Sequence, residues 1–268
     1  MLVGRRDIAL KSATIALALF VSLFIILAFV AVISWTSWSS LLSAFVSERV
    51  IYAVELSLFT SLTSTTLAIV TAVPIAYALS RTKFPGKGLV ELVLTVPLIL
   101  PPIAIGATLL IFFSSTAMGQ FLESVFMVVF EIPGLIVAQY CVIMPVITKV
   151  IKATFDSLDP MYEGMAETLG CSPSQSLWRV ILPMSYNGIA SAAVLGWSRA
   201  IGEFGASVML AGATPLKTET LPISIFLKLS VADIPGAVAL IVIMVAIAVL
   251  VFFGLQRTPI GRYALAGG

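Results

Sequence analysis

Histidine is absent from the 268-residue sequence, and charged residues make up only 10% of it, against roughly 25% in a soluble domain. Without histidine the chain lacks the commonest general base and the commonest metal ligand of proteins. So few charges cannot cover a surface that faces water, and 60% of the residues are hydrophobic, so most of the chain must face lipid. The net charge of +2 is too small to indicate nucleic-acid binding. The absence of histidine, the few charged residues and the small net charge predict an integral membrane protein with no metal site and no nucleic-acid partner.

The sequence also lacks a phosphate-binding loop of the pattern Gly-x-x-x-x-Gly-Lys-Ser/Thr. The nearest approach is Gly86-Lys87, which is followed by Gly88 and has neither the first glycine nor a preceding strand. The two cysteines, Cys141 and Cys171, fall in an apolar segment and in a long loop, so neither a disulfide nor a metal site is expected. Paired buried carboxylates, or a nucleophile beside a base, are not visible either. The chain is therefore not expected to be an enzyme, and ATP could drive it only through a separate subunit.

Six apolar segments are visible, at about 13–34, 51–79, 88–113, 133–151, 186–211 and 235–255. Each is near or above the ~20 residues that a helix needs to cross the hydrocarbon layer. The first follows a positively charged start, but it is longer than the ~7–15 residues of a signal-peptide core and is expected to be a retained span. A shorter apolar stretch at 121–130 contains Glu123 and is expected to be an external loop or an interfacial helix. The predicted fold is an all-α integral membrane protein of six transmembrane helices, one permease-like domain over 1–268.

The distribution of lysine and arginine predicts how the chain is oriented. With the N-terminus in the cytoplasm, eleven of the fifteen basic residues lie inside: Arg5, Arg6, Lys11, Arg81, Lys83, Lys87, Lys149, Lys152, Arg179, Arg257 and Arg262. Only Arg49, Lys217 and Lys228 then lie outside, and Arg199 lies within a span. Because cytoplasmic loops carry an excess of lysine and arginine, we expect a multi-pass protein of the inner or plasma membrane with both termini in the cytoplasm.

One loop is much longer than the others, and its centre is the segment 156–183. Asp159-Pro160 is typical of a helix start, because a capping residue precedes proline at the first helical position. Leu169-Gly170 is typical of a helix end, and Ser172-Pro173 of a second start. The pattern predicts a cytoplasmic helix–turn–helix that lies under the membrane. Its expected apolar anchors are Met161, Met165, Leu169 and Leu177.

This loop resembles the Glu-Ala-Ala loop of ABC transporter permeases, which reads Glu-Ala-Ala, three residues, Gly, nine residues, Ile, one residue, Leu-Pro. The matching positions are Ala166, Gly170, Val180 in place of Ile, Leu182 and Pro183. Gly164 and Met165 stand where the family has Glu and Ala, and a glutamate flanks them on each side. In the family this loop forms a coupling helix that docks into a groove on the ATPase subunit. The residues that the resemblance assigns to this contact are Glu163, Gly164, Met165, Ala166, Glu167, Leu169 and Gly170. The alternative is an ordinary interfacial hairpin with generic caps.

The fifth apolar segment carries a stripe of small residues and two charges. Gly188, Ala192, Gly196 and Ala200 recur every four residues, which allows two helices in lipid to approach closely. In a helix, Arg199 and Glu203 would lie within about 60° of Gly196, on the same face. Two interpretations stay open: an ion pair between Arg199 and Glu203 that fixes helix packing, or a border of a translocation route. The first is favoured for Glu203, because a lone carboxylate would repel an anion.

Three prolines interrupt the third apolar segment, namely Pro97, Pro101 and Pro102. Proline removes a backbone donor and kinks a helix. Interrupted helices are tolerated at membrane depth only where protein or water covers them. The bend could simply shape the core, but we favour a cavity wall. Pro101 and Pro102 therefore join Arg199, Glu203, Gly196 and Ala200 as candidate residues of the pathway or of helix packing.

Four stretches narrow the resemblance to permeases of the molybdate/tungstate and sulfate/thiosulfate importers. They are Thr95–Gly106, Ser198–Ala206, Met209–Gly212 and Lys217–Pro222, and the resemblance covers most of 50–257. The Leu-Pro-Pro run and the Thr-x-Thr-Leu-Pro run favour molybdate/tungstate. Ala213, where relatives often carry Asn, and Leu216, where they often carry Gly, depart from the pattern.

The resemblance implies a machine with several partners. It implies a homodimer of this chain, two ATP-binding-cassette subunits that use ATP and Mg, and an external substrate-binding protein, with no cofactor held by this chain. A sulfate/thiosulfate permease is the nearest alternative. An ion-coupled secondary transporter is a third, although the extra intramembrane carboxylates or inverted repeat typical of that class are not visible.

Overall fold

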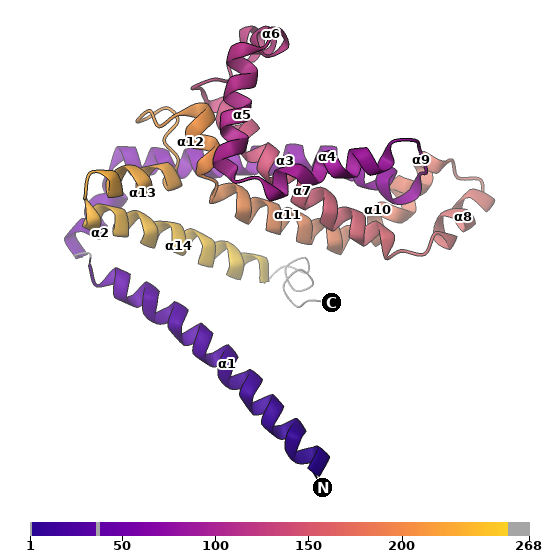
Figure 1. Cartoon of the computed structure of the whole chain (residues 1–268), viewed down its shortest axis with the longest axis horizontal. Coiled ribbons are helices and arrows are strands. Elements are labelled where there is room, and N and C mark those ends of the chain that lie inside the picture. The colour runs from indigo at the N-terminus through magenta and orange to yellow at the C-terminus, as the bar shows by residue number, and fades with distance from the viewer. Residues whose placement is uncertain (1, 36–37, 257–268) are drawn as a thin grey trace.

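The computed structural model describes residues 2–35 and 38–256, and all regular structure in these ranges is helical (Figure 1). Arg257 and Arg262, expected inside, fall outside the described residues, as do the side chains of Arg5 and Arg6. The helices are α1 (Leu2–Ile33), α2 (Trp38–Val46), α3 (Glu48–Arg81), α4 (Lys87–Ile99), α5 (Pro102–Ser115), α6 (Ala117–Phe126), α7 (Ile132–Asp156), α8 (Met161–Thr168), α9 (Pro173–Ser176), a π-helical turn (Leu177–Ile181), α10 (Leu182–Met184), α11 (Tyr186–Ile201), α12 (Gly205–Ala211), α13 (Leu221–Ser230) and α14 (Ile234–Gln256).

Four described helices are long and apolar enough to cross a membrane: α1, α3, α7 and α14. Two bent pairs could each be one further span, α4 with α5, bent by 115°, and the 173–184 segment with α11, bent by 71°. The all-α membrane fold is thus confirmed, whereas six spans are reached only if each bent pair counts as one. The six-span count stays a prediction.

The third apolar segment is not one straight span, because it breaks at the expected prolines. Leu100 has φ −73° and ψ 138°, an extended conformation, because the ring of a following proline disfavours helix at the residue before it. Pro102 then opens α5, where a missing N–H costs nothing. Pro97 lies inside α4 without ending it. The whole 115° bend therefore belongs to Pro101 and Pro102.

The small-residue periodicity predicts a single helix over 186–211, and this prediction is wrong. Helix α11 ends at Ile201, with Gly202 as its C-terminal cap, and α12 begins at Gly205. The sequence analysis treated 186–211 as one apolar segment and did not consider Gly202 as a helix end. Glycine is common at the ends of helices, and Gly202 is the C-terminal cap of α11.

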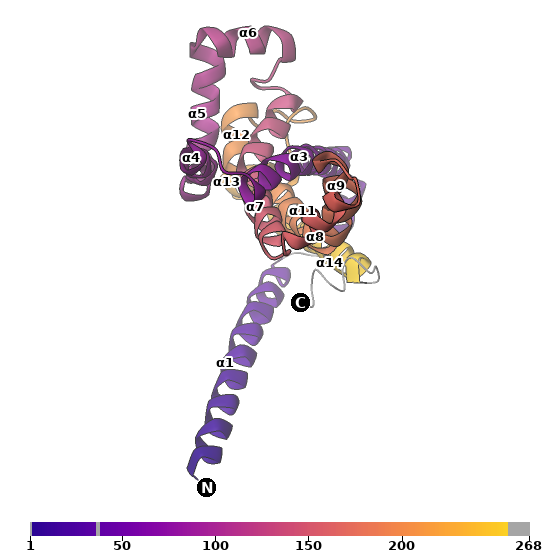
Figure 2. The ribbon, with the colours of Figure 1, turned by 90° about the vertical axis from the view of Figure 1, so that its right-hand side faces the viewer.

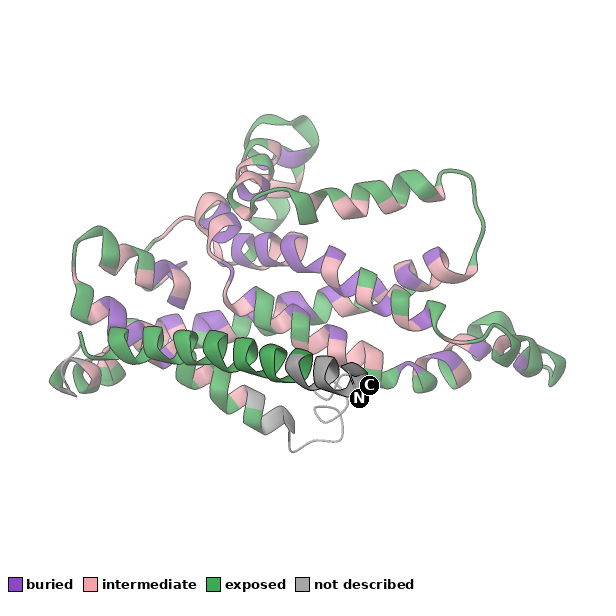
Figure 3. Cartoon of the chain, turned by 60° about the horizontal axis from the view of Figure 1, so that its bottom comes forward, coloured by how far each residue is buried: buried purple, intermediate pink, exposed green. Residues whose placement is uncertain are grey.

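The core of the molecule is the contact of α3 and α7, with α11 packed on both. Buried alanines of α3, Ala68, Ala72 and Ala76, face the isoleucines of α7. On α11, a Cβ on Gly188 would lie 2.2 Å from Thr154 Oγ1, and a Cβ on Gly196 would lie 2.3 Å from Ile147 Cδ1. Figure 3 shows the buried residues concentrated along these helices. The small-residue stripe of α11 is therefore a packing surface.

Buried polar groups join α3 and α7 as well. The Gln139 amide donates from Nε2 to Thr60 Oγ1 at 3.2 Å, and Ser64 Oγ donates to Gln139 Oε1 at 2.9 Å. Gln139 and Thr60 are both fully buried. Hydrogen bonds of this kind hold transmembrane helices together where no water is present to compete.

Two parts project from this bundle. Helix α1 leaves it on one side, with its described side chains exposed, and the α5–α6 unit leaves it on the other (Figures 1 and 2). The helical segments α8–α9 lie at one end of the bundle, and α2 and α13 lie at the opposite end (Figure 1). The loop expected in the cytoplasm is thus far from the elements expected outside.

The crossing of α5 and α12 yields a first prediction. A Cβ on Gly106 would lie 2.6 Å from the backbone oxygen and 2.7 Å from the Cα of Ala206. Backbone cannot rotate away, so Gly106→Ala should destabilise the protein by about 1–3 kcal/mol through overpacking. The measurement is thermal unfolding in detergent, with Gly88→Ala as the control, because nothing lies within 4 Å of a Cβ there. Equal unfolding temperatures for the two variants would contradict the crossing.

Candidate functional site

Local hydrogen bonds define both ends of α8. The Asp159 carboxylate accepts the N–H of Met161 at 2.8 Å. At the other end, Gly170 has φ +90° and donates its N–H to Glu167 O at 2.9 Å, and Cys171 donates to Ala166 O at 3.0 Å. These two bonds form the Schellman motif that ends many helices with a left-handed glycine. The Ala166–Gly170 spacing that carries the resemblance is therefore also the spacing of a helix end.

The second half of the loop is helical from Pro173 to Met184, with a π-helical turn at its centre. Ser172 and Gln175 form a capping box, in which each side chain accepts the backbone N–H of the other. The sequence pattern predicts that this second helix ends at Pro183, and it ends one residue later, at Met184.

The faces of α8 differ in what they meet. Ala166 is buried, and α8 contacts α9 and the π-helical turn. Met161, Met165 and Leu169, expected as anchors, are exposed in a row along the helix, and Leu169 is 86% exposed. Of the four expected anchors, Leu177 alone packs against the core. A helix end that presents an apolar row which this chain does not cover is suited to docking on another surface.

The two glutamates of α8 point in different directions. Glu163 Oε1 lies 2.6 Å from Arg81 Nε, and Glu163 Oε2 accepts the hydroxyl of Tyr77 at 3.1 Å. Arg81 also donates from Nη2 to Leu158 O at 2.8 Å. Glu167, in contrast, is exposed, and so is Gly164, whose Cα has open space around it. Of the two, only Glu167 offers a carboxylate to a partner.

The predicted ion pair within the fifth segment is present. Arg199 Nη1 lies 2.8 Å from Glu203 Oε2, although the contact is not aligned as a hydrogen bond. Glu203 is 1% exposed and Arg199 is 43% exposed. The other oxygen of Glu203 accepts the N–H of Ala206 at 2.9 Å. The carboxylate therefore neutralises a cation and satisfies a free donor in the first turn of α12.

The breaks of the third and fifth segments meet. A Cβ on Gly205, the first residue of α12, would lie 3.0 Å from Ile103 N and 3.4 Å from Pro102 Cβ. Pro102 and the loop that holds Glu203 therefore belong to one junction, while Gly196 and Ala200 are buried in the packing face of α11. Pro101 is exposed beside this junction. The structure thus separates the candidate pathway residues into a junction and a packing stripe.

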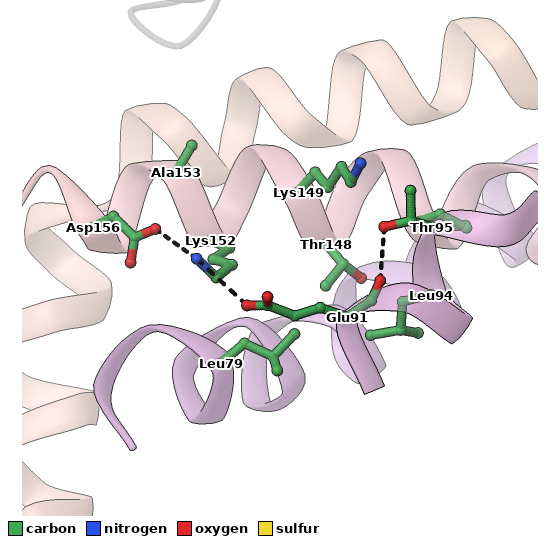
Figure 4. Close-up of a pocket in the computed structure, with 10 residues that line it drawn as sticks. Leu79, Glu91, Leu94, Thr95, Thr148, Lys149, Lys152, Ala153 and Asp156 are labelled. Carbon is green, nitrogen blue, oxygen red and sulfur yellow. Dashed lines mark hydrogen bonds and ion pairs between the residues drawn. The ribbon is translucent and has the colours of Figure 1, made fainter. Parts of the chain in front are cut away.

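A cavity of about 410 Å³ lies between the ends of α3, α4 and α7 nearest to α8 (Figure 4). Lys152 Nζ stands between two carboxylates, 2.8 Å from Asp156 Oδ2 and 3.8 Å from Glu91 Oε1. Ser80 of α3 donates to Asp156 Oδ1 at 2.5 Å. The sequence reading missed this group, although Glu91 is the only charge in the segment 88–113 and Lys152 and Asp156 have helical ion-pair spacing.

Each of the three cations expected outside is engaged with a carboxylate. Arg49 Nε lies 2.7 Å from Glu219 Oε2, Lys228 Nζ lies 2.7 Å from Asp233 Oδ2, and Lys217 contacts Glu131. The Lys228 ammonium and the N–H of Gly236 lower the pKa of the Asp233 carboxyl, so this pair stays charged at neutral pH. These three cations are therefore not free to hold an anion.

Comparison with known proteins identifies this arrangement. Residues 64–258 match the family described as the inner membrane component of binding-protein-dependent transport systems. The chain belongs to this family. It is 35% identical over 212 residues to the molybdenum transport system permease protein ModB of Mycobacterium tuberculosis, covering 78% of this chain and 80% of that protein. It is 30% identical over 243 residues to the sulfate transport system permease protein CysT of Salmonella typhimurium, covering 89% and 88%.

Solved structures of such transporters share the fold. A bacterial alginate ABC transporter in complex with an alginate pentasaccharide-bound periplasmic protein matches with a TM-score of 0.74 at 19% identity, covering 94% of this chain and 95% of that chain. The resemblance to ABC permeases, the multi-pass membrane class and the role as a transport subunit are thereby confirmed. Molybdenum and sulfate permeases are both similar, so the cargo is a matter for proposal.

The Arg199–Glu203 contact yields a second prediction for this permease. Arg199→Met leaves a buried carboxylate without its cation and should lower the unfolding temperature. Glu203→Gln keeps an acceptor for Ala206, so the double variant should recover part of the loss. A double-mutant cycle by thermal unfolding should give a coupling energy of about 0.5–3 kcal/mol. Strictly additive losses would mean that the two side chains do not interact.

Proposed function

We propose that this permease forms the translocation pathway for a tetrahedral oxyanion, most specifically molybdate or tungstate. In this proposal two copies of the chain pair as a homodimer, two ATPase subunits bind at the α8 end, and an external binding protein delivers the cargo. ATP and Mg are held by the ATPase subunits, and this chain holds no cofactor. The molybdenum permeases among its relatives support this cargo.

The observation that carries the proposal is the exposed row of α8. Met161, Met165 and Leu169 project from a capped helix at the end of the bundle, and Glu167 is exposed on another face of that helix. An exposed apolar row that this chain leaves uncovered suits a groove on a folded partner. When the two ATPase subunits close on each other, a docked α8 would move with them. This movement would shift the membrane helices and open the pathway alternately to the two sides of the membrane. Met161 thereby joins the residues proposed for this contact.

The pathway itself is proposed to bind its cargo weakly. A conduit that held a dianion tightly would not release it. Arg199 at the α11–α12 junction and the three outer cations are all paired with carboxylates, which supports this view. Selectivity then belongs mainly to the external binding protein.

Sulfate or thiosulfate is the second candidate cargo, because sulfate permeases are also among the relatives. The sulfate permease relative matches 89% of this chain at 30% identity, and a molybdenum permease relative of Haloferax volcanii matches the same share at 34% identity. The sequence runs Pro101-Pro102 and Thr218–Pro222, in contrast, favour molybdate over sulfate. The cargo assay decides between the two.

Transport in proteoliposomes is the third prediction. The chain, reconstituted with its ATPase and binding protein, should take up molybdate and tungstate only when ATP is supplied. Sulfate should compete poorly. Uptake without ATP or without the ATPase would reject the proposal in favour of ion-coupled transport, and sulfate uptake that molybdate does not inhibit would move the cargo to the second candidate.

The end of α8 yields a fourth prediction. Gly170 has φ +90°, a value that the proline ring forbids, so Gly170→Pro should break the Schellman motif and disorder α8. We expect the ATPase to be lost on purification of the complex, while membrane insertion is unchanged. Gly170→Asn is the matched control, because asparagine tolerates the left-handed conformation. If the proline variant still assembles and transports normally, the proposed role of this loop is wrong.

A further inference from the structure

The contact between Arg81 and Glu163 differs from the other ion pairs of the described residues. Arg81 is 11% exposed and Glu163 is 14% exposed, and in no other pair of that part of the chain are both side chains so deeply buried. Arg81 is the last residue of α3, and Glu163 lies in the first turn of α8. A cation at a helix C-terminus and a carboxylate at a helix N-terminus are each stabilised by the helix dipole.

Further hydrogen bonds surround this ion pair, and we call Arg81, Glu163 and their partners Tyr77 and Leu158 the Arg81–Glu163 clamp. Arg81 Nη2 donates to Leu158 O in the connection that precedes α8, at 2.8 Å. Tyr77, one turn before Arg81, donates to the second oxygen of Glu163 and packs its ring edge-on against Phe155 of α7. Both carboxylate oxygens and two guanidinium nitrogens are thereby engaged. These contacts join helix α8 to the end of α3.

The clamp continues into neighbouring helices through adjacent residues. Ser80 precedes Arg81 and donates to Asp156 at the end of α7. Asp156 pairs with Lys152, which reaches Glu91 of α4 at 3.8 Å (Figure 4). This last contact is longer than the others, and α4 has no buried residue among its own. The polar chain therefore runs from α8 through α3 and α7 to a loosely held helix that ends at the Pro101 break.

We propose that the Arg81–Glu163 clamp makes α8 and the inner end of α3 move as one body, so that a displacement of α8 reaches α7 and α4. Arg81 and Glu163 are then positioning residues of the coupling step. Glu163 acts inside this chain, rather than as the ATPase contact that the resemblance assigned to it. The inference rests on the proposed function, because the displacement is supplied by a docked ATPase.

The test uses the full transporter in proteoliposomes, with Arg81→Met and Glu163→Gln as single variants. Both leave the exposed row of α8 in place, so the ATPase should still copurify and hydrolyse ATP. Uptake per ATP hydrolysed should fall by about tenfold, within the roughly 5–150-fold range usual for coupling between sites. Lys83→Met, an exposed cation two residues from Arg81, is the matched control and should behave as the unmodified protein.

Exchange of the two charges provides a rescue. Arg81→Glu with Glu163→Arg restores an ion pair but opposes both helix dipoles, so uptake per ATP should recover in part. Each half of the exchange alone places like charges together and should couple worse than either single neutral variant. If Arg81→Met and Glu163→Gln take up as much cargo per ATP as the unmodified complex does, the clamp is wrong. ATP-dependent uptake by the unmodified complex would still support the proposed function.

A distance measurement separates the clamp from the proposed function. Spin labels at Lys83→Cys and Thr168→Cys, after replacement of Cys141 and Cys171, report how α8 sits relative to the end of α3 in the chain alone. One narrow distance distribution is expected, broadened by Glu163→Gln. An equally narrow distribution in that variant would reject the clamp, whether or not an ATPase binds. If the distance distribution of the unmodified chain is narrow but the chain never binds an ATPase, the clamp stands and the proposed function is rejected.

Discussion

The close approach of α3, α7 and α11 positions the functional elements at both ends of the molecule. The buried alanines of α3 pack in one cluster with side chains of α7, and a Cβ added to Gly188 or Gly196 of α11 would collide with side chains of α7. Three helices packed at this distance cannot slide past each other without repacking, since cores have discrete arrangements. Their ends nearest to α8 therefore hold Arg81, Asp156 and the start of α11 in a fixed relation. Helix α8 is attached to that frame through Glu163.

Backbone hydrogen bonding explains where this frame is interrupted. A broken helix leaves donors and acceptors that lipid cannot satisfy. At Pro101 and Pro102 the problem is reduced, because proline has no N–H to satisfy. At Gly202–Phe204 the Glu203 carboxylate accepts a free N–H of α12. The two breaks adjoin where Gly205 meets Ile103. Glu203 in the fifth segment thus has a structural role that does not depend on any contact with cargo.

The features predictable from the sequence were those whose bonds are local. Asp159, Gly170 and Ser172 act on residues within five positions, so their caps follow from the pattern. The Arg81–Glu163 contact joins residues 82 positions apart, and no local pattern indicates it. The break after Ile201 was missed for another reason. Glycine serves both close helix packing and helix ends, and spacing alone does not distinguish the two at Gly202.

Ion pairs of the described residues do different work at the two ends of the helix bundle. At the α13 end Arg49, Lys217 and Lys228 are each paired with a carboxylate, and so is Arg199 at the junction of the broken helices. A free cation there would hold a dianion. At the α8 end the pairs connect different helices instead, α3 with α8 and α7 with α4. Ion pairing thus occupies the cations near the proposed route, and it joins helices at the end where we propose that an ATPase docks.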